Sequence, residues 1–121
     1  MKQKSLILIL GGSALACIVA VVPAIRIRIE CARHVRQLES ADPAAFEEAF
    51  AALAYDLDDD VVPLLCDEAE EAYRGSRFAL YYQILRILHE RCGCRLTLED
   101  VKLPPPEHVR RIVEERRRGR R

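Results

Sequence analysis

The sequence predicts an all-α protein, with an N-terminal transmembrane helix followed by a small helical-hairpin, HEAT-like bundle of three to four helices. Two observations predict this class. An uncharged apolar run lies near the start of the chain, and apolar residues recur at helical spacing over most of the remaining chain. Without the run, about 95 of the 121 residues remain, which suits one small domain.

The apolar run extends from Leu6 to Ile25, twenty residues without a charge, and Ser13 is its only hydroxyl-bearing residue. As a helix the run would be about 30 Å long, which is the thickness of the hydrocarbon core of a bilayer. A helix of a soluble core would have a polar face, and this segment has none. Residues 1–26 are therefore predicted to be a retained membrane anchor.

A cleaved signal peptide is the alternative for this segment. Lys2 and Lys4 precede the run, and small residues at Ala16 and Ala24 suit cleavage, although the run is longer than a usual signal core. A lipoprotein signal at Cys17 ranks last, because alanine occupies the third position before it, where leucine is usual.

Charges on the two sides of the run predict the orientation of the anchor. Four arginines follow the run within the window that governs topology, against Lys2 and Lys4 before it: Arg26, Arg28, Arg33 and Arg36. The heavier positive side predicts a single-pass membrane protein whose C-terminal domain is cytoplasmic.

Three regions are expected after the anchor. Residues 27–41 continue as a juxtamembrane helix and turn, because apolar residues recur there once per helical turn. Residues 42–94 form the helical domain. Residues 95–121 contain a proline-rich linker and a basic C-terminal helix or tail.

Capping signals divide the helical domain. Asp42 is expected to be the N-cap of a helix that has Pro43 in its first turn and ends near Asp56. Asp60 is expected to cap a second helix, which ends at Gly75.

A third helix is expected to start with Ser76 as its cap and to end at Gly93. Its apolar stripe is Phe78, Tyr81, Tyr82, Leu85, Leu88 and Cys92. The segment RLTLEDV could be a short extended piece. A last helix begins near Pro106, and its thin apolar stripe predicts that it docks lightly or lies on another surface.

The segments DPAAFEEAFAALAYDLDDDVVPLL and GSRFALYYQILRIL resemble HEAT-type helical repeats over residues 42–92. Helix starts near Ala44 and Arg77 are 33 residues apart, close to the spacing of helical-hairpin repeats. The resemblance implies a scaffold or binding surface rather than a catalyst. A compact bundle of three or four helices remains the alternative.

The net charge of zero hides a strong asymmetry. Eleven acidic residues and one arginine lie between Asp42 and Arg74, and seven arginines follow His108. The acidic outer face of the second helix is either solvated or a binding surface for a protein partner, and its residues are Asp67, Glu68, Glu70 and Glu71. The basic end is either a charged terminus or a contact for lipid or anions through Arg116, Arg117, Arg118, Arg120 and Arg121. Nucleic acid is an unlikely partner, because no aromatic residues interleave with the arginines.

The cysteines leave two interpretations open. Cys92 and Cys94, separated by one glycine, could bind a soft metal ion or exchange with a disulfide, and Cys31 and Cys66 could complete a set of four. Alternatively, Cys31, Cys66 and Cys92 pack as small hydrophobic residues, and Cys94 lies in a loop. The aspartates of residues 58–60 are interpreted as a helix-start signal, because a calcium loop needs alternating ligands and a glycine.

No motif for a nucleophile, a phosphate-binding loop or a metal-binding helix occurs in the chain, and no catalytic residue or cofactor is predicted. The sequence therefore predicts a membrane-tethered, non-catalytic module that binds an unidentified protein partner and contacts the bilayer through its N-terminal helix. A thiol redox or metal-handling protein that uses the Cys-Gly-Cys motif is the alternative.

Overall fold

The computed structural model describes residues 22–96 and 103–119, and all regular structure in these ranges is helical. The predicted all-α class is therefore confirmed. Residues 22–37 form the first described helix, called here the 22–37 helix. The later elements are α2 (Pro43–Ala51), the π-helical turn η1 (Ala52–Asp56), α3 (Val61–Arg74), α4 (Phe78–Cys92) and α5 (Pro106–Gly119).

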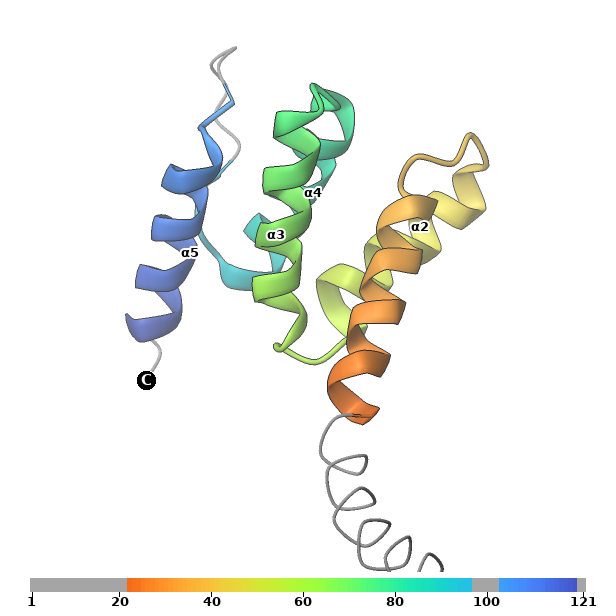
Figure 1. Cartoon of the computed structure of the whole chain (residues 1–121), viewed down its shortest axis with the longest axis horizontal. Helices are drawn as coiled ribbons and strands as arrows, with labels where there is room; N and C mark the ends of the chain where they lie inside the picture. Colours follow the sequence, from red (N-terminus) through yellow and green to blue (C-terminus); the bar gives the residue numbers. More distant parts are fainter. Residues whose placement is uncertain (1–21, 97–102, 120–121) are drawn as a thin grey trace, which may run out of the picture.

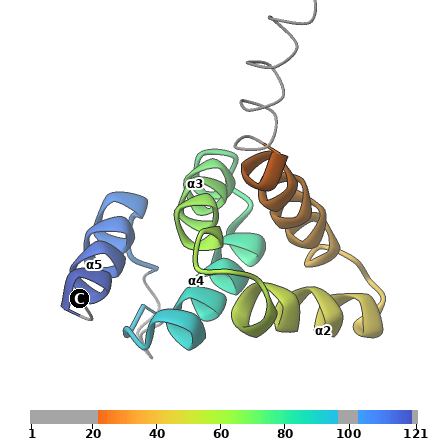
Figure 2. The ribbon, with the colours of Figure 1, turned by 90° about the horizontal axis from the view of Figure 1, so that it is seen from below.

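The helices form two layers. The 22–37 helix, α3 and α5 lie side by side in one layer, and α2 and α4 lie behind them (Figure 1). The view from below separates the two layers (Figure 2). Helix α3 occupies the middle of the first layer, where it packs against both α4 and α5.

One hydrophobic core joins the described helices. Helix α3 presents a strongly amphipathic surface, whose apolar side is buried while its acidic side faces outward. The other helices close over that apolar side with residues that are almost completely buried: Cys31, Val35, Leu53, Ile84, Leu85, Leu88, Val109 and Val113.

Helix α5 docks against α3 and α4 through a thin apolar stripe. Val109 and Val113 are each only 1% exposed. The hydroxyl of Tyr81 on α4 donates a hydrogen bond to the carbonyl oxygen of Pro104, just before α5 begins. Helix α5 contacts both α3 and α4, and its buried residues are Pro106, Val109 and Val113.

The predicted start of α2 is confirmed. Asp42 is its N-cap, and its side-chain oxygen accepts a hydrogen bond from the amide of Ala44 at 3.1 Å, with Pro43 at the first helical position. The helical path ends at Asp56 as expected, although its last turn widens into the π-helical η1.

Two predicted caps are not formed. Asp60 lies at the N-cap position of α3, but its side chain makes no capping hydrogen bond. Instead, Asp58 Oδ1 accepts a hydrogen bond from the amide of Asp60 at 3.2 Å. Ser76 does not cap α4, whose N-cap position is occupied by Arg77.

Ser76 instead belongs to the C-terminal end of α3. Its φ is 56°, in the left-handed region, whereas Gly75 has an ordinary φ of −82°. The amide of Ser76 donates to Tyr73 O and the amide of Arg77 donates to Ala72 O, which is a Schellman motif. The glycine predicted to end α3 therefore lies one residue before the position that favours glycine, whereas Gly93 ends α4 in the left-handed region as expected.

Several predicted features fall outside the described residues: most of the apolar run from Leu6 to Ile25, most of RLTLEDV, and Arg120 and Arg121. Among the helices of residues 22–96 and 103–119, none combines the length and the apolar character needed to cross a bilayer.

The Schellman motif generates a stability prediction. Ser76→Gly should raise the free energy of unfolding by about 0.5–1 kcal/mol, because glycine adopts a positive φ without the steric cost that serine carries. Urea unfolding of the full chain in detergent micelles, followed by circular dichroism, measures the change. Gly75→Ala is the matched control and should not destabilise, because the nearest atom to an added Cβ is Glu71 O at 3.5 Å. A lower stability of Ser76→Gly would contradict the assignment of Ser76 as the left-handed residue.

Candidate functional site

The acidic face of α3 is divided between two neighbouring helices. Asp67 and Glu70 lie on the edge next to α5, where Arg110 Nη2 is 2.8 Å from Asp67 Oδ1 and 3.2 Å from Glu70 Oε2. Glu70 is also 3.9 Å from Arg74 of its own helix. The hydrogen bond to Asp67 is the main cause that raises the pKa of Arg110. Two of the four residues of the predicted binding face therefore form ion pairs that hold α5 against α3.

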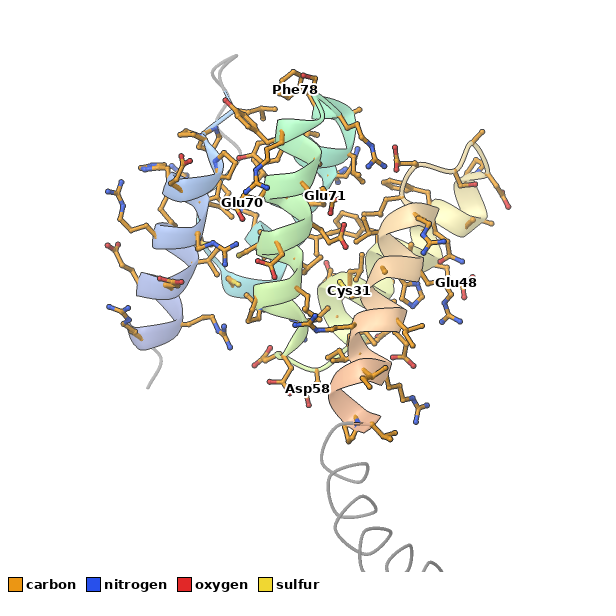
Figure 3. All side chains as sticks on the ribbon, in the orientation of Figure 1. Cys31, Glu48, Asp58, Glu70, Glu71 and Phe78 are labelled. Atoms are coloured by element: carbon orange, nitrogen blue, oxygen red, sulfur yellow. The ribbon has the colours of Figure 1, made fainter. Side chains whose placement is uncertain are left out.

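Glu68 and Glu71 lie on the other edge of α3. Figure 3 shows Glu71 on the side of α3 that faces the 22–37 helix, and Glu70 on the side of α5. Glu71 is exposed and forms no ion pair within the described part of the chain.

Glu68 is half-buried beside it. Burial raises the pKa of Glu68, the charges of Glu71 and Asp67 raise it further, and Arg36 on the 22–37 helix lowers it. We call Glu68 and Glu71 the acidic edge. Sequence periodicity correctly placed four acids on one face, but it could not separate the acidic edge from the pair that binds Arg110.

The four described cysteines are buried: Cys31, Cys66, Cys92 and Cys94. Burial raises the pKa of Cys31 to about 12, with smaller effects of Glu68 and Asp67. Burial also raises the pKa of Cys66 to about 11. A hydrogen bond with Cys92, together with burial, raises the pKa of Cys94. These environments disfavour the reactive thiolate.

The described residues contain no cluster of three or more His, Cys, Asp or Glu side chains arranged to hold a metal ion. Packing as small hydrophobic residues accounts for Cys31, Cys66 and Cys92, all of which belong to the core. Cys94, expected in a loop, is also buried in that core, after the end of α4.

The basic C-terminal end of α5 lies near the end of the fold at which the 22–37 helix begins. Arg116 and Arg118 are exposed, and Arg117 is half-buried. The C-terminal end of α5 lies at the same end of the fold as the start of the 22–37 helix (Figure 1), and Asp58 lies at that end as well (Figure 3).

A groove that the sequence did not indicate lies at this end of the fold. It has a volume of about 550 Å³ and runs between the start of the 22–37 helix and the start of α3. Its lining combines apolar side chains with charges of both signs: Pro23, Ile27, Leu57, Pro63, Leu64, Arg26, Arg28, Asp58 and Asp60. No sequence pattern could reveal it, because its two walls are more than a helix apart in the chain.

Two aromatic residues at the opposite end of the fold are more exposed than the sequence predicts. The predicted stripe of α4 placed Phe78, Tyr81 and Tyr82 together in the core. Tyr81 is fully buried, but Phe78 is 49% and Tyr82 42% exposed. Tyr73 on α3 packs against Phe78, with ring centroids 5.7 Å apart.

No known family model matches the chain, and neither a curated protein nor a solved structure shows significant similarity to it.

The division of the acidic face predicts a charge-reversal effect. Arg110→Glu should lower the free energy of unfolding by about 1 kcal/mol, because it replaces a partly exposed ion-pair cluster with like charges. Adding Glu70→Arg should restore part of the loss. The adjacent Arg111→Glu is the control, since Arg111 contacts His108 of its own helix. Urea unfolding of the four proteins measures these effects, and equal losses for Arg110→Glu and Arg111→Glu would contradict the assignment.

The buried thiols predict slow chemical labelling. The raised pKa of Cys31, from 9.0 to about 12, lowers its thiolate fraction at neutral pH by about three orders of magnitude. In a Cys17→Ser background, maleimide labelling at pH 8 should therefore be slow in native protein and fast in urea. Stability should also fall as the pH rises from 9.0 towards 12, because unfolded thiols ionise first. Rapid labelling of native Cys92 and Cys94 would instead favour the thiol redox alternative.

Proposed function

We propose that this protein is a membrane-tethered, non-catalytic protein-interaction module whose binding surface includes the acidic edge of α3. The proposal rests on one observation: Arg110 binds only two of the four carboxylates of the acidic face. Asp67 and Glu70 are bound by Arg110, whereas Glu71 is exposed and Glu68 keeps a raised pKa beside it. These two neighbouring carboxylates leave negative potential for a basic partner, although Arg36 lies near Glu68.

The order of the helices supports a HEAT-like surface. Successive helices alternate between the two layers: the 22–37 helix, α2, α3, α4 and α5 (Figures 1 and 2). Stacked helical hairpins use this alternation to build extended binding surfaces from neighbouring helices. In the proposed module, the outer face of α3 provides that surface.

The tether follows from the apolar run that ends at Ile25, directly before Arg26 and Arg28. The proposed orientation places the helical domain in the cytoplasm. The basic end of α5 would then approach the anionic leaflet at the same end of the fold, through Arg116, Arg117 and Arg118 and the following Arg120 and Arg121.

A charge-reversal crosslinking experiment tests the proposed binding surface. The full chain carries a photoreactive residue at position 64, a half-buried position of α3, and is crosslinked in native membranes. Glu68→Lys/Glu71→Lys should abolish a crosslinked partner band that the wild-type protein forms, because the partner's basic residues would meet like charge.

The matched control is Glu47→Lys/Glu48→Lys on α2, which makes the same change in net charge at two exposed positions. The control should retain the partner band. An identical pattern of bands in wild type and both variants would contradict the role of the acidic edge. Release of the protein from membranes by alkaline carbonate would contradict the tether.

A further inference from the structure

The 22–37 helix has an outward face that no other described helix covers. Val22 and Ile25 are half exposed, and Ile29 is 62% exposed. Their spacing of three and four residues places them on one side of the helix. Cys31 and Val35, on the opposite side, are buried in the core. The helix therefore has apolar residues on two sides, although only one side packs within the domain.

Charged residues lie on the same outward face. Arg26, Glu30 and Arg33 line a shallow surface together with Val22, Ile25 and Ile29. Arg26 Nε is 3.4 Å from Glu30 Oε1. At 100° per residue, Arg36 falls on this side as well. The face thus changes along the helix from apolar at Val22 to basic at Arg33 and Arg36.

We infer that this outward face lies in the lipid–water interface and contacts anionic phospholipids. The inference rests on the proposed tether, since the face continues the apolar run for one further turn beyond Ile25. When a helix leaves a bilayer obliquely, its lipid-facing side stays in contact with lipid over more residues than its other side. Apolar side chains therefore extend further along the lipid-facing side. Arginines beyond that point extend their guanidinium groups to lipid phosphates, while their aliphatic stems cover the apolar surface.

The charges favour lipid over a second copy of the chain. In a parallel pair of these helices, Arg26, Arg33 and Arg36 would face their own copies, and like charges at such positions destabilise the contact. Anionic headgroups neutralise the same arginines and contribute about 1 kcal/mol for each basic residue near the surface. The same face therefore fits an anionic membrane surface better than it fits itself.

Tryptophan fluorescence in reconstituted membranes tests this inference. The chain contains no tryptophan, so Ile29→Trp introduces a single reporter. Full-length protein is placed in nanodiscs of phosphatidylcholine and phosphatidylserine, with and without brominated acyl chains. The reporter should emit at short wavelength and lose about half of its intensity or more to bromine, because an interfacial helix buries its apolar face by about 5–10 Å.

Phe78→Trp is the matched control, because Phe78 has a similar exposure and lies at the opposite end of the fold (Figure 3). Its emission should not respond to bromine. Arg33→Gln/Arg36→Gln in the Ile29→Trp background should reduce the quenching, and replacing phosphatidylserine by phosphatidylcholine should do the same.

Absence of bromine quenching at position 29, in protein that alkaline carbonate does not extract, would overturn the inference and leave the tether intact. A short-wavelength emission that depends on the protein-to-lipid ratio, without quenching, would assign the face to a second copy and would also overturn it. Extraction by carbonate would instead show that the tether itself is wrong.

Discussion

The arrangement of the helices depends on the hydrogen bonds and the ion pair that the Arg91 guanidinium group forms. Arg91 lies near the end of α4 with its side chain only 8% exposed, and it donates to Leu53 O at 2.8 Å and to the carbonyl oxygen of Leu57. Asp59 lies 3.3 Å away and supplies the opposite charge. A buried cation without such acceptors would cost several kcal/mol, so this pairing fixes the end of η1 against α4. The position at which α3 begins is fixed with it.

The position of α3 then determines what its acidic face can do. The face lies between two helices of the same layer, so its two edges have different neighbours (Figure 1). Arg110 of α5 binds Asp67 and Glu70 on one edge. On the other edge, Arg36 lowers the pKa of Glu68, but burial keeps that pKa above its usual value. Four acidic residues of similar sequence context therefore divide into a structural pair and a pair with remaining negative potential.

Local signals in the sequence predicted the class and several helix ends, because a cap such as Asp42 acts within two or three residues. These signals gave the wrong residue where two neighbouring residues could occupy the same capping position. Asp58 accepts the hydrogen bond from the amide of Asp60, and the Schellman motif assigns the left-handed conformation to Ser76 although Gly75 is adjacent. The division of the acidic face was beyond prediction, because Arg110 is 43 residues from Asp67 and periodicity carries no information on such pairs.

The tether and the acidic edge form one proposal, because neither would suffice alone. Two carboxylates at a solvent-exposed surface stabilise a complex by about 1 kcal/mol each at most, and salt screens that contribution further. A partner held in the same membrane has a raised effective concentration, so the tether adds to a contact that would be too weak alone. An outward face of the 22–37 helix in contact with lipid would also restrict the rotation of the domain.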